Sequence, residues 1–127
     1  MATNAIVDLV QQRIGEISPE TAERLINAVL ETLAERDLSG AHTGFAAELP
    51  PEYGAILNDP DRTSHEHFDV EEFIRRVGER ANVSYPQSET WTRAALTALV
   101  ENVPTEERNR FVSHFPDDLA DYTHWVV

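Results

Sequence analysis

The residues of this chain best suited to chemistry lie in the short segment "HEH", which is His65, Glu66 and His67. Histidine nitrogens and carboxylate oxygens are ligands that zinc and other divalent ions accept. Two histidines separated by one residue do not share a helix face, however, and no strand is expected here to align them. The surrounding residues are polar, so the pattern favours a solvated loop, with a metal site at His65 and His67 as the alternative.

The other histidines, His42, His114 and His124, have no serine or acid at a spacing that specifies a catalytic triad. The chain contains no cysteine, which rules out thiol nucleophiles, disulfides and cysteine-bound zinc. We therefore predict that the protein is not an enzyme and has no cofactor.

Two groups of arginines could bind an anion or a partner. Arg75, Arg76 and Arg80 form one group, and Arg108 and Arg110 form the other. Guanidinium groups bind carboxylates and phosphates through paired hydrogen bonds. Glutamates lie one turn away from the first group, which equally favours ordinary ion pairs on a helix surface. Arg76, Arg108 and Arg110 are taken as candidate partner-binding residues.

Aromatic residues are concentrated in the second half of the chain, and most of them are expected in its core. They are Phe68, Phe73, Tyr85, Trp91, Phe111, Phe115, Tyr122 and Trp125. The C-terminal segment "DYTHWVV" contains the last two. It either packs on the protein's own helices or leaves an apolar surface for a partner or a second copy. Tyr122 and Trp125 complete the candidate partner-binding residues.

The sequence of 127 residues carries a formal net charge of −13, and all ten basic residues are arginine. Such a field repels nucleic acid, whose binding depends on neutralising phosphates, and it opposes anionic membrane surfaces. We expect neither as a partner. Two explanations of the acidic, lysine-free composition stay open. One is a salt-rich cytoplasm that screens the surface charge, and the other is a GC-rich coding sequence that favours arginine.

The spacing of apolar residues predicts a chain made of helices, so helices are expected to position these histidines, arginines and aromatic residues. Steps of three and four residues run from Ile6 to Ile17, and a wider apolar face follows Ser18 and Pro19 as far as about Arg36. Two shorter helices are expected before residue 57, and residues 58–67 form a polar loop.

The same order of expected helices then begins again in the second half of the chain. Asp69 is expected to cap the first helix there, and Pro86 lies near the start of the next. Thr105 is expected to cap a third helix, and a last short helix follows Pro116.

The two halves share residue types at a constant spacing. At an offset of 63, "RIGE" at residues 13–16 matches "RVGE" at residues 76–79. A three-residue insertion changes the offset to 66, at which Phe45 and Pro50 match Phe111 and Pro116. We infer an internal duplication within a single domain, residues 1–127. Repeat 1 covers about residues 5–57 and repeat 2 about residues 68–125, with three to four helices each. They are expected to form an all-α helical bundle, either about a pseudo-twofold axis or stacked.

Gly15 and Gly78 occupy the same place in the first helix of each half. Glycine inside a helix costs about 1 kcal/mol relative to alanine. A close crossing of two helices would justify this cost, and a position near a helix end would avoid it. The sequence leaves both interpretations open.

Three motifs recur in the same order in both halves. They are an "RVGE"-type first helix, a long second helix such as "AERLINAVLETLAER", and a short helix ending in "AAELPPEY". The second set reads "FDVEEFIRRVGERANV", "TRAALTALVENVPTEE" and "FVSHFPDD". From about Ile6 to Trp125 the chain resembles the bacterial and archaeal domain-of-unknown-function family 2267. The resemblance implies an all-helical fold with two related halves, and it brings no established activity and no catalytic residues.

These observations predict a small module that acts by binding a protein partner or a second copy of itself. No apolar run approaches the ~20 residues that span a bilayer, and no signal peptide is recognisable, so a cytoplasmic protein is expected. The alternative is a small-ligand or metal-binding protein. It would use a pocket between the halves or the loop of His65, Glu66 and His67.

Overall fold

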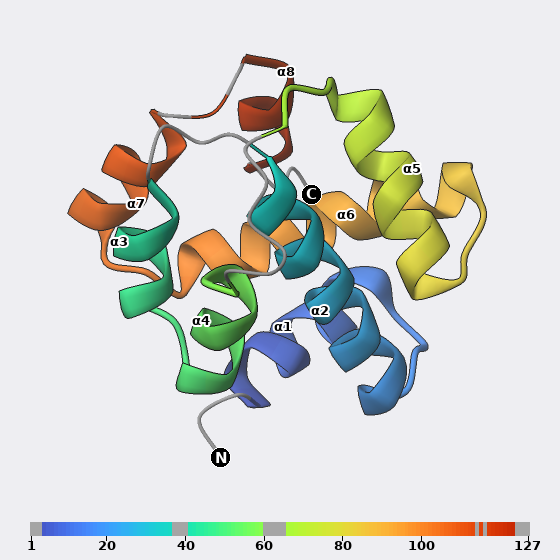
Figure 1. Ribbon diagram of the computed structural model, residues 1–127. Coiled ribbons are helices and arrows are strands. Elements are labelled where there is room, and N and C mark those ends of the chain that lie inside the picture. Colours follow the sequence, from blue (N-terminus) through green and yellow to red (C-terminus); the bar gives the residue numbers. More distant parts are fainter. Residues whose placement is uncertain (1–3, 37–40, 60–65, 114, 116, 124–127) are drawn as a thin grey trace.

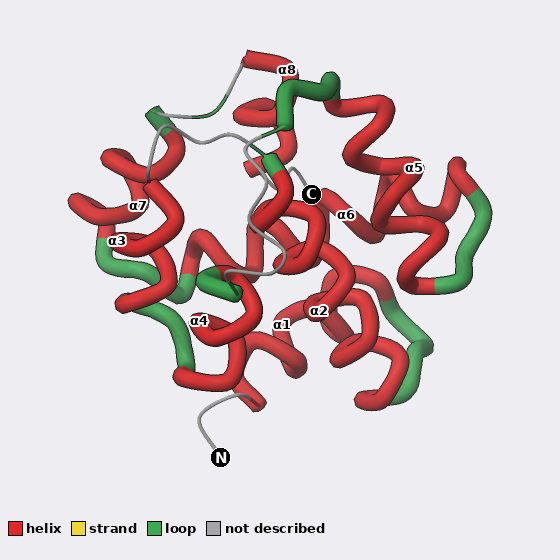
Figure 2. Tube along the Cα trace, viewed as in Figure 1, coloured by secondary structure: helices red, strands yellow, loops and turns green. Residues whose placement is uncertain are grey.

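Helices make up the regular structure of the chain (Figure 1). The computed structural model describes residues 4–36, 41–59, 66–113, 115 and 117–123. This part of the chain contains eight α-helices, one 3-10 helix and no strand. Figure 2 colours the helices red and the loops and turns between them green. The elements are α1 (Asn4–Ile14), α2 (Pro19–Glu35), α3 (Ala41–Ala47), α4 (Pro51–Leu57), α5 (Val70–Ala81), α6 (Tyr85–Glu101), α7 (Thr105–Val112), α8 (Asp117–Ala120) and η1 (Asp121–Thr123). The predicted all-α class is confirmed, and none of the described helices is long and apolar enough to cross a membrane.

Side-chain caps set two of the helix starts at the predicted residues. The hydroxyl of Ser18 accepts a hydrogen bond from the backbone N–H of Thr21 at 3.1 Å and begins α2. The carboxylate of Asp69 accepts one from the backbone N–H of Glu72 at 2.9 Å and begins α5. Each cap satisfies a backbone donor that has no partner inside its helix.

The predicted cap of the third helix in the second half was wrong by one residue. Pro104 has extended backbone angles, φ −53° and ψ 147°, and occupies the cap position of α7. Thr105 is therefore the first helical residue rather than the cap. The φ of Pro104 is compatible with a helix, and its ψ of 147° is what places it outside α7.

The two long helices, α2 and α6, form the centre of the molecule. They pack against each other, α2 also packs against α5, and α6 also packs against α1. Each long helix buries a wide apolar face, which includes Leu25, Ile26 and Leu30 in α2 and Leu96 and Leu99 in α6. The first helix of each half of the chain, α1 or α5, thus contacts the long helix of the other half, α6 or α2.

Three aromatic rings pack together at the contact between α3 and α7. Helices α3 and α7 lie side by side (Figure 1). The rings of Phe45 and Phe111 stack with their centroids 3.7 Å apart and their planes 5° apart. Phe115 meets Phe111 edge-on at 4.8 Å. All three rings are buried, as expected for the aromatic core.

The two matched glycines have different structural roles. Gly15 follows the end of α1 with φ +107°, a conformation that glycine adopts without strain. Gly78 lies inside α5, where an added Cβ would be 3.2 Å from the Cβ of Ser88 and 3.2 Å from the carbonyl oxygen of Val83. The helix-end interpretation therefore holds for Gly15, and the close-crossing interpretation holds for Gly78.

Candidate protein-contact surface

Arg76 lies at the centre of an ion-pair cluster between α5 and α2. Its guanidinium donates to Glu35 at 3.1 Å, Glu66 at 3.0 Å and Glu72 at 2.8 Å. It also lies 4.0 Å from the centroid of the Phe68 ring, and its side chain is 20% exposed. A partner would have to displace one of these carboxylates to bind this candidate residue.

Arg80 completes the contact between the same two helices. It donates to the hydroxyl of Thr32 at 2.8 Å and to the carboxylate of Glu35 at 2.6 Å. Burial alone would raise the pKa of Glu35, but the hydrogen bonds and charges of Arg80 and Arg76 outweigh burial and lower this pKa. Glu35 therefore stays ionised and joins α2 to α5 through two guanidinium groups.

Arg75 occupies the outer face of α5. It pairs with Glu72 and Glu79 on the same helix. Hydrogen bonds from Arg75 and then from Arg76 lower the pKa of Glu72 to about 2. The charge of Arg75 is thus matched by two carboxylates at the surface.

The two arginines of α7 have different environments. Arg108 donates to three backbone carbonyls at the end of α6, those of Val100, Glu101 and Val103, at 2.9, 3.1 and 3.2 Å. It thereby satisfies carbonyl groups that lack partners inside the helix. The side chain of Arg110 is 69% exposed and pairs with a glutamate one turn earlier. Of these two candidates, Arg110 is the more exposed.

Tyr122 packs on the chain itself. Its hydroxyl donates to the carboxylate of Glu89 at 3.1 Å, and the guanidinium of Arg93 lies 4.3 Å from the centroid of its ring. The residue is buried, and burial followed by the hydrogen bond to Glu89 raises the pKa of its hydroxyl to about 12. Tyr122 therefore joins η1 to α6.

Two predicted site residues, Trp125 and His65, lie outside the described residues. His67 is exposed at the surface. Among the described residues, no three histidine, aspartate or glutamate side chains lie close enough together to hold a metal ion. The metal-site alternative at His65 and His67 stays a prediction.

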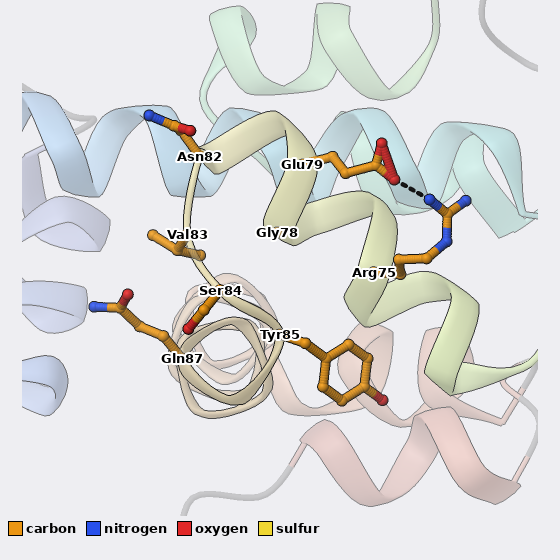
Figure 3. Close-up of a pocket in the computed structure, with 8 residues that line it drawn as sticks. All are labelled: Arg75, Gly78, Glu79, Asn82, Val83, Ser84, Tyr85 and Gln87. Carbon is orange, nitrogen blue, oxygen red and sulfur yellow. Dashed lines mark hydrogen bonds and ion pairs between the residues drawn. The ribbon is translucent and has the colours of Figure 1, made fainter.

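An open hollow of about 470 Å³ lies at the turn between α5 and α6. We call its lining the Tyr85 surface. It consists of Arg75, Gly78, Glu79, Asn82, Val83, Ser84, Tyr85 and Gln87. Tyr85 is 43% exposed, and no other large hydrophobic side chain of the described residues is exposed. Figure 3 shows Tyr85 and Arg75 at one end of the hollow and Asn82 and Gln87 at the other, with Gly78 between them.

Local sequence explains why this turn is well defined. Asn82 ends α5 in the left-handed conformation, with φ 62° and ψ 50°, which asparagine tolerates better than most residues. Ser84 is the cap residue of α6, so Tyr85 becomes the first helical residue. Below the turn, the hydroxyl of Ser88 donates to the carbonyl of Ile74 at 2.7 Å and holds α6 against α5.

A second hollow, of about 500 Å³, lies where the connection between α1 and α2 meets α6. It is lined by Ile14, Glu16, Ile17, Ser18, Thr21, Gln87 and Trp91. Its lining combines residues from both predicted repeats. The alternative function places a ligand between the two repeats.

The sequence profile of a family described as uncharacterized conserved protein, DUF2267, matches residues 3–122. The chain belongs to the DUF2267 family. The match confirms the resemblance seen in the order of the motifs, and it covers α1 to η1 as far as Tyr122. Among curated proteins, no sequence matches this DUF2267 chain.

In this DUF2267 protein, most of the described aromatic residues are buried, as expected, and Tyr85 is the one among them that is exposed. Tyr85 lies six residues before Trp91, and at 100° per residue it is turned by about 120° from the apolar face of α6. The angular position of Tyr85 around α6 was therefore the sequence signal that could have identified this residue as exposed. Composition alone could not separate this tyrosine from the buried ones.

Proposed function

We propose that this protein is a non-enzymatic module that binds another protein through the Tyr85 surface. The observation that carries the proposal is the exposed aromatic ring of Tyr85 beside an open hollow. Tyrosine and arginine are enriched at protein interfaces and among the residues that contribute most to binding. A tyrosine also provides a large contact area with few rotatable bonds to immobilise.

The environments of the other candidate residues support this choice of surface. Arg76, Arg108 and Tyr122 have their polar groups bound to carboxylates or carbonyls of the chain itself. Arg110 is accessible, but it is one exposed charge paired within its own helix, and such pairs contribute little to stability or binding. The Tyr85 surface instead combines an exposed aromatic ring with a hollow.

Site-specific photo-cross-linking tests the proposed function. A benzoylphenylalanine replaces Tyr85 in the full chain in its own cells, and a matched variant carries it at Glu106, an exposed position on α7. We expect one defined protein to be cross-linked at position 85 and not at position 106. Binding of that purified protein should weaken at least tenfold in Tyr85→Ala, because truncating an anchoring tyrosine removes about 2 kcal/mol.

Equal labelling at both positions, or no adduct at position 85, would contradict the proposal. The absence of an adduct would instead favour a small-ligand protein. That second candidate is supported by the hollow at Trp91, which residues from both predicted repeats line.

We also propose that the bundle consists of two related halves arranged about a pseudo-twofold axis. Helices α2 and α6 start and end 66 residues apart, the same offset that matches the two sequences. Two ion pairs between the halves support this arrangement. Arg13 of the first half binds Glu101 of the second at 2.8 Å, and Arg76 of the second binds Glu35 of the first at 3.1 Å. The two arginines are 63 residues apart and the two glutamates 66, so both pairs join matched positions.

A second set of contacts supports the same proposal. Glu23 and Glu89, which are 66 residues apart, each accept a hydrogen bond from a tyrosine near the end of their own half, at 3.0 and 3.1 Å. The stacked rings of Phe45 and Phe111 join matched positions directly. The exchanged ion pairs and the stacked phenylalanines favour the axis over a stacked arrangement. The contacts of Glu23 and Glu89 lie within their own halves and support the relation between the halves.

A further inference from the structure

Trp91 lines the second hollow, which we call the Trp91 hollow, and brings a hydrogen-bond donor to it. The residue is 9% exposed, and its indole N–H has no hydrogen-bond partner among the described residues. Its nitrogen is not among the fully enclosed atoms that lack a partner, which are Asn27 Oδ1 and Thr92 Oγ1. The indole N–H of a buried tryptophan usually has a partner. This donor is therefore available to a molecule that enters the hollow.

The connection between α1 and α2 forms another wall of the Trp91 hollow, and hydrogen bonds hold its shape. The backbone N–H of Gly15 donates to the carbonyl of Gln11 at 2.8 Å, and that of Ile17 donates to the carbonyl of Gly15 at 2.8 Å. The side-chain amide of Gln11 donates to the carbonyl of Ile17 at 3.0 Å. This wall is thus formed without a ligand, as in most small-molecule sites.

The lining of the Trp91 hollow combines apolar surface with one negative charge. Ile14 and Ile17 are partly buried and supply the apolar surface. Among the described residues that line the hollow, Glu16 is the one that carries a charge. It is exposed, and its carboxylate accepts no hydrogen bond within the described part of the chain. The volume of about 500 Å³ lies in the range of sites that hold small organic molecules.

The matched position in the first half shows that packing alone does not require an indole here. Trp91 corresponds to Leu25 at the offset of 66, and Leu25 is completely buried in the core. Leucine fills such a position with apolar atoms only. Tryptophan adds an N–H donor, and at Trp91 this donor borders a hollow.

We propose that the Trp91 hollow binds a small organic ammonium ion that has an apolar body and a hydroxyl or carbonyl oxygen. The oxygen accepts a hydrogen bond from the indole N–H of Trp91, the body packs on Ile14 and Ile17, and the ammonium group pairs with Glu16. Glu16 and the net charge of −13 favour a cation over carboxylates and phosphates. The proposal goes beyond the proposed function, because Tyr85 does not line this hollow.

The test titrates the full-length protein with tyramine and two analogues. Phenethylamine lacks the hydroxyl group, and 3-(4-hydroxyphenyl)propionate carries a carboxylate in place of the ammonium group. NMR follows the indole N–H resonance of Trp91, and Trp91→Phe assigns it, because the chain has two tryptophans. We expect tyramine to shift this resonance to saturation. Phenethylamine should bind about fivefold more weakly, because it offers no acceptor to the indole, and the propionate should not bind.

Three variants assign the contacts of tyramine. Glu16→Gln should weaken tyramine binding about twofold to fivefold, because an exposed ion pair is lost. Glu106→Gln makes the same change in net charge on α7 and should not weaken binding. Both glutamates are exposed, so these variants leave the core unchanged. Trp91→Phe should make tyramine and phenethylamine bind equally, as measured from the ligand resonances, because phenylalanine has no N–H.

A Trp91 indole resonance that tyramine does not shift would overturn the proposal. Equal binding of tyramine and phenethylamine to the wild type, or binding of the propionate as strong as that of tyramine, would also overturn it. Equal effects of Glu16→Gln and Glu106→Gln would show attraction to net charge alone. The proposed function has a separate outcome: a partner cross-linked at position 85 of a chain that does not bind tyramine preserves protein binding and rejects the ammonium site.

Discussion

At the scale of single residues, position on a helix decides what each arginine does. Arg108 and Arg110 are two residues apart and therefore point to different sides of α7. One donates to the carbonyl groups at the end of α6, and the other extends into solvent. The sequence identified both as candidate partner-binding residues, because residue type and spacing do not reveal which carbonyl groups lie opposite.

This difference predicts unequal effects of two alanine substitutions. Arg108→Ala should lower the free energy of unfolding by about 2 kcal/mol, because three carbonyls lose a charged donor. Arg110→Ala should change it by less than about 0.5 kcal/mol, because an exposed pair within one helix contributes little. Urea unfolding of the two variants and the wild type measures both values. Similar losses in the two variants would contradict the assigned role of Arg108.

At the scale of elements, the spacing between α5 and α6 depends on Gly78 and Ser88. The two helices cross closely enough that a side chain at Gly78 would contact Ser88 and Val83 at 3.2 Å. This crossing also supports the turn that exposes Tyr85. The matched glycine, Gly15, ends its helix with a positive φ, so the duplicated motif has two different structural outcomes.

Two glycine substitutions test this packing. Gly78→Ala should destabilise the fold by about 1 kcal/mol or more, because the cost of overpacking exceeds the gain in helix propensity. Gly44→Ala is the control, since that position in α3 has no atoms within 4 Å of an added Cβ. It should stabilise the fold by up to about 1 kcal/mol. Thermal unfolding distinguishes the two, and a stabilised Gly78→Ala would show that the crossing is not tight.

At the scale of the whole molecule, the net charge of −13 opposes folding through repulsion between surface carboxylates. Several arginines are engaged in contacts between elements, such as Arg13 with α6 and Arg80 with α2, where they oppose part of this repulsion. Salt screens the remaining repulsion, because the screening length falls from about 10 Å at 0.1 M to about 3 Å at 1 M.

The charge predicts that the midpoint of thermal unfolding rises with salt concentration. Sodium and potassium chloride should act alike, because screening depends on ionic strength. Loss of helical circular dichroism at low salt would support adaptation to a salt-rich cytoplasm. A midpoint that is independent of salt would favour the GC-rich coding explanation of the arginine content.

The sequence by itself determined the helical class, the capped starts of α2 and α5, and the family, because periodicity and caps depend on residues within a few positions of one another. The tertiary structure decided which candidate residues are accessible. Arg76 is held by Glu35, which is 41 residues away, and Tyr85 is exposed because it begins α6 outside its apolar face. Such outcomes depend on which distant helix faces each side chain, and local patterns do not contain that information.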